Sequence, residues 1–180
     1  MNTSFFVSLD KKALYHNIEY LREYKQKELL PVLKANAYGH DILLIAKALY
    51  DYDVKVWAVA RYSEAVSICE YFKTLSIDDF KILIFESLID DYSLLEKYPQ
   101  ICPTLNSIKD LKNALANNIS IDRLSLKIDF GFGRNGIKYE EVDELKNLIK
   151  YNSLKFLSIF SHLFSASYTC LLYTSDAADE

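Results

Sequence analysis

Short apolar runs alternate with amphipathic helical patterns along most of the chain, and this alternation is the feature that most constrains the fold. Apolar runs occur at residues 30–33, 56–60, 81–85, 101–105, 124–128 and 154–160. Helical spacing of apolar residues fills the intervals between them. Strands that are apolar on both faces belong to parallel sheets covered by helices. The pattern therefore predicts either a (β/α)8 barrel or a doubly wound sheet.

Helix starts are also visible in the sequence. Asp10, Ser63 and Ser107 each precede a segment with apolar residues on one helical face. Oxygen atoms in such side chains can accept hydrogen bonds from the free backbone N–H groups of a first helical turn. We therefore expect these three residues to be N-caps.

The number of repeating units predicts that the barrel is incomplete. A closed barrel needs eight strands and about 250 residues, whereas this chain of 180 residues offers five full units and a sixth strand. We expect residues 1–164 to form the N-terminal part of a barrel domain. Residues 165–180 lack strand alternation and are expected to be a non-native or disordered tail. A genuine chain terminus is the alternative.

Composition excludes several classes of function. The chain has 21 basic and 25 acidic residues, a net charge of −4, and no stripe of basic residues that could follow a phosphate backbone, so no nucleic-acid partner is expected. No segment approaches the roughly 18 apolar residues of a membrane helix, and no basic leader opens the chain, so we expect a soluble cytoplasmic protein. Three cysteines and three histidines are dispersed, which predicts neither a disulfide framework nor a metal site.

One lysine stands at a position suited to covalent catalysis. Lys34 follows the first apolar run and is followed at once by a turn that contains Gly39. An ammonium group at the end of a buried strand loses hydration, which disfavours its charged form and frees the nitrogen to attack a carbonyl carbon. Lys34 is therefore a candidate Schiff-base lysine.

A glycine-rich turn follows the fifth apolar run. Three of the four glycines in the chain fall within residues 129–136, around Arg134. In a barrel, Arg134 would project at the carboxyl ends of the strands, as Lys34 would, and a guanidinium there suits a carboxylate ligand. A tight turn with a solvated arginine is the plain alternative. The turn lacks the spacing of a dinucleotide-binding fingerprint.

Both segments resemble the alanine racemase family. Residues 34–40, Lys-Ala-Asn-Ala-Tyr-Gly-His, are similar to its pyridoxal-phosphate lysine motif, and residues 127–136 to the segment that positions the substrate carboxylate. The resemblance extends over about residues 5–164. It implies the pyridoxal-phosphate barrel domain of that family, an incomplete (β/α)8 TIM barrel in this chain.

The resemblance also implies roles for individual residues. Lys34 would bind the cofactor and act as one catalytic base. Tyr38, expected at the start of the following helix, would bind the cofactor phosphate. His162 would lie beside the cofactor ring, while Arg134 would bind the substrate carboxylate. Lys127 matches a carbamylated lysine, whose negative charge would orient Arg134, because two cations at close range repel.

The implied activity is interconversion of L- and D-alanine, for D-alanine and peptidoglycan biosynthesis, by a homodimer. A second base from the partner subunit's second domain would be required, so the 180-residue chain alone is predicted to be inactive. It is also predicted to be poorly soluble, because an unclosed sheet leaves strand edges and apolar surface exposed. Phe130 replaces a small hydroxyl residue of the family, which leaves the choice among small amino acids open. The alternatives are a single-barrel, non-catalytic carrier of pyridoxal phosphate and a decarboxylase of the same superfamily, and residues 35–40 favour the racemase over both.

Overall fold

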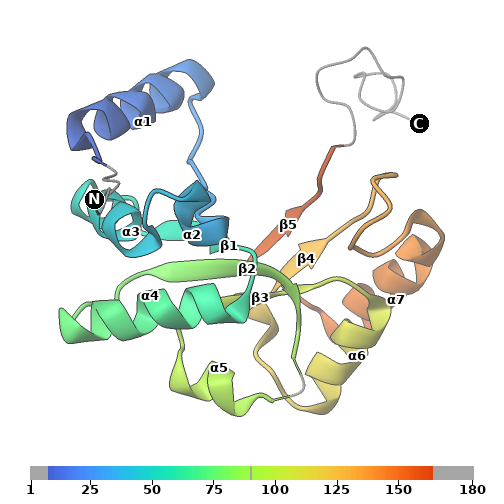
Figure 1. Cartoon of the computed structure of the whole chain (residues 1–180). Helices are drawn as coiled ribbons and strands as arrows, with labels where there is room; N and C mark the ends of the chain where they lie inside the picture. Colours follow the sequence, from blue (N-terminus) through green and yellow to red (C-terminus); the bar gives the residue numbers. More distant parts are fainter. Residues whose placement is uncertain (1–7, 90, 164–180) are drawn as a thin grey trace, which may run out of the picture. The chain divides into compact units, whose positions relative to one another are not determined.

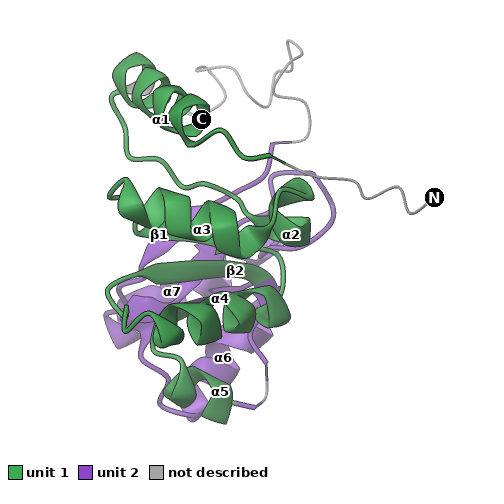
Figure 2. Ribbon diagram, turned by 60° about the vertical axis from the view of Figure 1, so that its left-hand side comes forward, with its two compact units in different colours: residues 1–85, 92–101 green, residues 86–91, 102–180 purple. Residues whose placement is uncertain are grey.

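The computed structural model describes residues 8–89 and 91–163. The chain forms two compact units, one from Met1–Phe85 and Tyr92–Ile101 and the other from Glu86–Asp91 and Cys102–Glu180 (Figure 2). Residues 165–180 lie outside the described part, so the expectation of a foreign or disordered tail stays a prediction. No helix within residues 8–89 and 91–163 has the length and apolar character needed to cross a membrane.

In the part of unit 1 that the structure describes there are two parallel strands and five helices, which are labelled in Figure 1. Its strands pair in register from Val56 with Lys81 to Val59 with Ile84. Trp57, Phe72 and Phe80 form an aromatic core, in which the rings of Phe72 and Phe80 lie 4.9 Å apart. The elements are α1 (Lys11–Lys25), α2 (Lys34–Tyr38), α3 (Ile42–Asp51), β1 (Val56–Val59), α4 (Tyr62–Thr74), β2 (Lys81–Ser87), whose last two residues belong to unit 2, and α5 (Ser93–Lys97).

Unit 2 contains three parallel strands and the helices that follow them. Leu105, Leu111, Leu124 and Leu126 are buried in its core, where apolar faces of the strands meet those of the helices. The elements are β3 (Ile101–Leu105), α6 (Ile108–Ala116), the 3₁₀ helix η1 (Ile121–Arg123), β4 (Ser125–Lys127), the 3₁₀ helix η2 (Tyr139–Glu141), α7 (Val142–Asn152) and β5 (Ser158–Phe160).

Strand order decides between the two predicted architectures. The strands are ordered β1-β2-β3-β4-β5, which is the order of the chain, and helices alternate with them. A doubly wound sheet reverses its strand order at a switch point, whereas a barrel adds each strand beside the previous one. The predicted incomplete (β/α)8 barrel is therefore confirmed.

The first predicted strand, residues 30–33, is reduced to a single parallel bridge between Val32 and Ala58. The backbone N–H of Leu33 donates to the oxygen of Ala58 at 2.7 Å, and Ala58 donates to the oxygen of Pro31 at 2.8 Å. Pro31 has no N–H to extend the ladder. The segment keeps the place of a barrel strand but has only one bridged residue.

Two of the three predicted helix caps are confirmed. Asp10 Oδ1 accepts from the backbone N–H of Lys12 at 2.9 Å, and Ser107 Oγ accepts from that of Asp110 at 3.1 Å. Ser63 is not a cap, because α4 already begins at Tyr62. The position before the helix is Arg61, and Glu64 accepts from its backbone N–H at 3.1 Å. Glu64, in the first turn, instead accepts from the backbone N–H group that precedes the helix.

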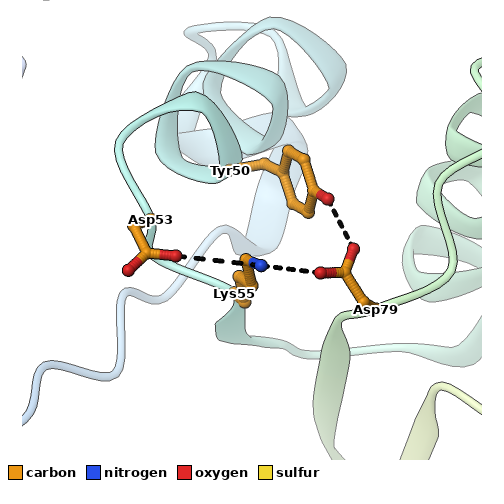
Figure 3. Close-up of polar contacts among 4 residues, drawn as sticks. All are labelled: Tyr50, Asp53, Lys55 and Asp79. Atoms are coloured by element: carbon orange, nitrogen blue, oxygen red, sulfur yellow. Dashed lines mark hydrogen bonds and ion pairs between the residues drawn. The ribbon is translucent and has the colours of Figure 1, made fainter.

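A polar cluster connects the end of α3 to the segments that precede β1 and β2 in unit 1 (Figure 3). Lys55 Nζ lies 2.6 Å from Asp79 Oδ2 and 3.8 Å from Asp53 Oδ1. The hydroxyl of Tyr50 donates to Asp79 Oδ1. Two hydrogen bonds therefore converge on one carboxylate, one from an ammonium group and one from a phenol.

Candidate functional site

The backbone after Lys34 forms a left-handed turn. The φ angles of Ala35, Asn36, Ala37 and Tyr38 are 54°, 55°, 53° and 53°, and that of Gly39 is 86°. Left-handed helical geometry costs about 1–2 kcal/mol for each residue that has a Cβ atom. A run of four such residues persists only where surrounding contacts enforce it, which is typical of functional sites.

Hydrogen bonds enforce this turn at both ends. At its start, Glu64 Oε1 accepts from the backbone N–H of Ala35 at 2.6 Å, and Leu33 accepts from Ala37 at 2.8 Å. At its end, Asn36 Oδ1 accepts from the backbone N–H of Ile42, the first residue of α3, at 2.9 Å. The strained turn is therefore held by a side-chain acceptor from α4, Glu64, and by one of its own, Asn36.

Lys34 and Tyr38 lie together on this turn. Lys34 is half-buried, and its Nζ atom lies 5.7 Å from the centroid of the Tyr38 ring, within the range of a cation–π contact. Tyr38 is 61% exposed. The prediction that Tyr38 begins the next helix is wrong, because α3 begins at Ile42 after the cap Asp41. The amine is accordingly only partly shielded from water.

Lys127, the last residue of β4, is 5% exposed. Its Nζ donates to the backbone oxygen of Asn135 at 2.5 Å. Burial lowers the pKa of the Lys127 amine, and the positive charge of Arg134 lowers that pKa further, while Asp129 opposes the shift. The structure therefore places an ammonium group that is poorly stabilised next to Arg134.

The glycine-rich turn is folded around Asp129. Its carboxylate accepts from the backbone N–H of Gly131 at 3.1 Å and from that of Gly133 at 2.9 Å. Gly136 has a φ of +124°, and a Cβ atom there would lie 2.9 Å from the backbone nitrogen of Asp129. The close approach of two backbone segments therefore requires glycine at this position.

Phe132 brings Arg134 and His162 together. The guanidinium carbon of Arg134 lies 4.6 Å from the centroid of the Phe132 ring, and the rings of Phe132 and His162 meet edge to face at 4.7 Å. Arg134 is exposed and makes no ion pair within the part of the chain that the structure describes. A guanidinium so placed is available for an anionic ligand. Phe132 had no predicted role, because an aromatic residue in a turn carries no signal of its own.

The predicted site residues thus form two groups, each described within its own unit. Lys34 and Tyr38 lie on one turn of unit 1, and Lys127, Arg134 and His162 lie around the glycine-rich turn of unit 2. Among residues 8–89 and 91–163, no three histidine, cysteine or acidic side chains gather in a way that could hold a metal ion. Together the two groups hold two amines, a phenol, a guanidinium and an imidazole.

Comparison with known proteins gives these residues a context. The family model described as "Alanine racemase, N-terminal domain" matches residues 9–179. The alanine racemase of Fusobacterium nucleatum is 32% identical over 159 residues, covering 88% of this chain and 43% of that protein. The alanine racemase of Carboxydothermus hydrogenoformans is 34% identical over 164 residues, covering 87% and 42%. The chain spans less than half the length of these relatives.

Solved structures agree with the sequence relatives. The alanine racemase of Bartonella henselae, with covalently bound pyridoxal phosphate, has a TM-score of 0.73 and 25% identity, covering 89% of this chain and 48% of that one. The alanine racemase of Clostridium difficile 630 has a TM-score of 0.71 and 26% identity, covering 94% and 44%. The barrel geometry is therefore shared with these enzymes over most of the chain.

Proposed function

The chain belongs to the alanine racemase family, in the part that corresponds to the N-terminal domain, and we propose that the complete protein interconverts L- and D-alanine with pyridoxal phosphate. The observation that carries this proposal is the left-handed turn that follows Lys34. It presents a primary amine and a phenol together, and the sequence of the turn matches the family motif. A relative of 25% identity holds the same cofactor covalently.

The residues present fit this cofactor. An aldehyde condenses with a primary amine, and half-buried Lys34 supplies one. A phosphate requires hydrogen-bond donors, and the exposed hydroxyl of Tyr38 is one. His162 would lie beside the cofactor ring, and its edge-to-face contact with Phe132 would hold it in place.

Pyridoxal phosphate, when bound, supplies an electron sink that makes the α-hydrogen of an amino acid acidic. Lys34 Nζ is then the proposed base on one face of the α-carbon, where it removes or returns a proton. Inversion requires a second base on the opposite face. We propose that this base comes from a further domain of a partner subunit, so that a homodimer is the active form and the 180-residue chain alone is inactive.

Arg134 is the proposed carboxylate-binding residue. Its guanidinium makes no ion pair in the described part of the chain and packs on the ring of Phe132, which restricts its orientation. A planar guanidinium can bind both oxygens of a carboxylate at once. A small amino acid would therefore be held by its carboxylate, with alanine as the proposed substrate.

Lys127 is the proposed carbamylated lysine. The neutral amine adds CO₂ and loses one proton, which leaves a carbamate anion. Burial and Arg134 lower the pKa of this amine, so a larger fraction is neutral and able to react. The product replaces repulsion between two cations with attraction between Arg134 and an anion. A diffraction map of the complete protein that shows a free amine at Lys127 would contradict this proposal.

Racemisation by the complete protein tests the proposed function. The wild-type protein should interconvert the two alanine enantiomers, and Lys34→Arg should lower kcat by at least about a hundredfold, since it removes both the nucleophile and a base. Cofactor binding without racemisation would favour a non-catalytic carrier. Wild-type rates in the Lys34→Arg variant would contradict the assignment of Lys34.

A further inference from the structure

One carboxylate in unit 1 links the turn after Lys34 to the neighbouring strand. Glu64, in the first turn of α4, accepts from Ala35 at 2.6 Å through Oε1. Its Oε2 accepts from the backbone N–H of Ala60 at 2.9 Å and of Arg61 at 3.1 Å. Ala35 follows Lys34 directly, and Ala60 follows the end of β1. Three N–H groups from two segments therefore converge on Glu64.

Glutamate is suited to this position by its chemistry. An ionised carboxylate only accepts hydrogen bonds, and it offers two oxygens with about four acceptor sites. Hydrogen bonds to a charged acceptor are stronger than those between neutral groups. Glutamine has one oxygen and one donating NH₂ group, so it could accept from one side only and would direct a donor toward a donor on the other side.

The position of Ala35 makes its bond to Glu64 consequential. Ala35 is the first of the residues with left-handed backbone, and Asn36 and Asp41 secure the far end of the turn toward α3. Without Glu64, the strained backbone at Ala35 loses an interaction that offsets its cost and can relax toward right-handed geometry. Such a change would rotate the peptide next to Lys34 and redirect its side chain.

We propose that Glu64 is a positioning residue, which holds the left-handed turn in place and thereby sets the direction in which the Lys34 amine points. This inference rests on the proposed function of Lys34. Glu64 acts through the backbone of Ala35 and contacts neither cofactor nor substrate. The role is distinct from helix capping alone, because only Oε1 reaches the lysine turn, whereas Oε2 serves the start of α4.

Two glutamates on the same helix allow a matched experiment in the complete protein. Glu64→Gln removes the carboxylate next to Ala35. Glu70→Gln, further along α4, removes a carboxylate that accepts from the hydroxyl of Tyr98 and lies 3.3 Å from Lys97 Nζ. Amide hydrogen exchange of the peptide that covers residues 33–41 reports on the turn. The rate at which pyridoxal phosphate and borohydride label Lys34 reports on the amine.

In Glu64→Gln, the bond to Ala35 is either lost or reduced to one with a neutral acceptor, so we expect exchange at Ala35 to rise about tenfold and labelling of Lys34 to slow several-fold. Glu70→Gln should match the wild type in both measurements. Unchanged exchange at Ala35, or faster exchange with unchanged labelling, would overturn the proposal. Faster exchange throughout unit 1 would also overturn it, in favour of a general structural role.

The two proposals fail in different ways. If Lys34 of the wild-type protein is not labelled at all, the proposed function is contradicted. Exchange at Ala35 in Glu64→Gln then decides by itself whether Glu64 holds the turn.

Discussion

A single residue, Phe132, orients the guanidinium of Arg134 in the glycine-rich turn. Arg134 lies on the face of Phe132, and Phe132 in turn contacts the ring of His162. An arginine side chain in water has many rotamers, and packing on an aromatic ring reduces their number. The availability of Arg134 for a carboxylate therefore depends on a neighbour with no chemistry of its own.

Replacing Phe132 tests this dependence. Phe132→Leu keeps an apolar side chain and removes the aromatic face, so the KM for alanine should rise about two- to fivefold, which corresponds to an exposed cation–π contact of about 0.5–1 kcal/mol. Tyr139→Leu is the matched control, since Tyr139 is 77% exposed just after the same turn. Steady-state kinetics of the complete protein measure both variants. Equal KM values for the two would contradict the role of Phe132.

Elements differ in how far their sequence determines them. The strand and helix positions follow from apolar spacing, and the caps Asp10 and Ser107 from their hydrogen-bonding side chains. The left-handed turn after Lys34 does not follow, because four non-glycine residues adopt a backbone that each disfavours on its own. Contacts with distant segments, such as the hydrogen bond from Ala35 to Glu64, impose this turn. Local sequence patterns do not predict such contacts.

The glycine-rich turn offers a prediction at this scale. Gly136→Ala introduces a Cβ atom 2.9 Å from the backbone nitrogen of Asp129, so the backbone must shift. The alanine would also have a strained φ angle. At Gly133, φ is +75° and a Cβ atom would meet no other atom within 4 Å. Gly133→Ala should therefore cost only the strain of left-handed backbone, about 1–2 kcal/mol. Urea unfolding should therefore show a larger loss of stability for Gly136→Ala. Equal losses would contradict the close approach.

At the scale of the whole molecule, two groups of residues carry the proposed chemistry. The Lys34 turn belongs to unit 1, and the Lys127, Arg134 and His162 group to unit 2. Sequence resemblance proposes the members of both groups, and the structure adds Glu64 and Phe132, which contact them. Stability of each unit is therefore a condition for the site, and in unit 1 it depends on pH.

The pH dependence arises from the polar cluster of Figure 3. Hydrogen bonds from Lys55 and then Tyr50 lower the pKa of Asp79 below its ordinary value. Because the pKa is lower in the folded state, Asp79 contributes stability above its unfolded pKa of about 3.9, and that contribution is lost as pH falls through the folded value. Asp79→Asn should lower the midpoint of urea unfolding at pH 7. On acidification, this variant should lose less stability than the wild type does. Asp78→Asn is the control, and identical pH profiles for the two variants would contradict the assignment.

Reductive trapping tests the central claim most directly. The complete protein would be incubated with pyridoxal phosphate, reduced with borohydride, digested and mapped by mass spectrometry. We expect a single pyridoxyl-lysine at Lys34, and no comparable labelling at other lysines. Modification of a different lysine, with Lys34 recovered unmodified, would contradict it.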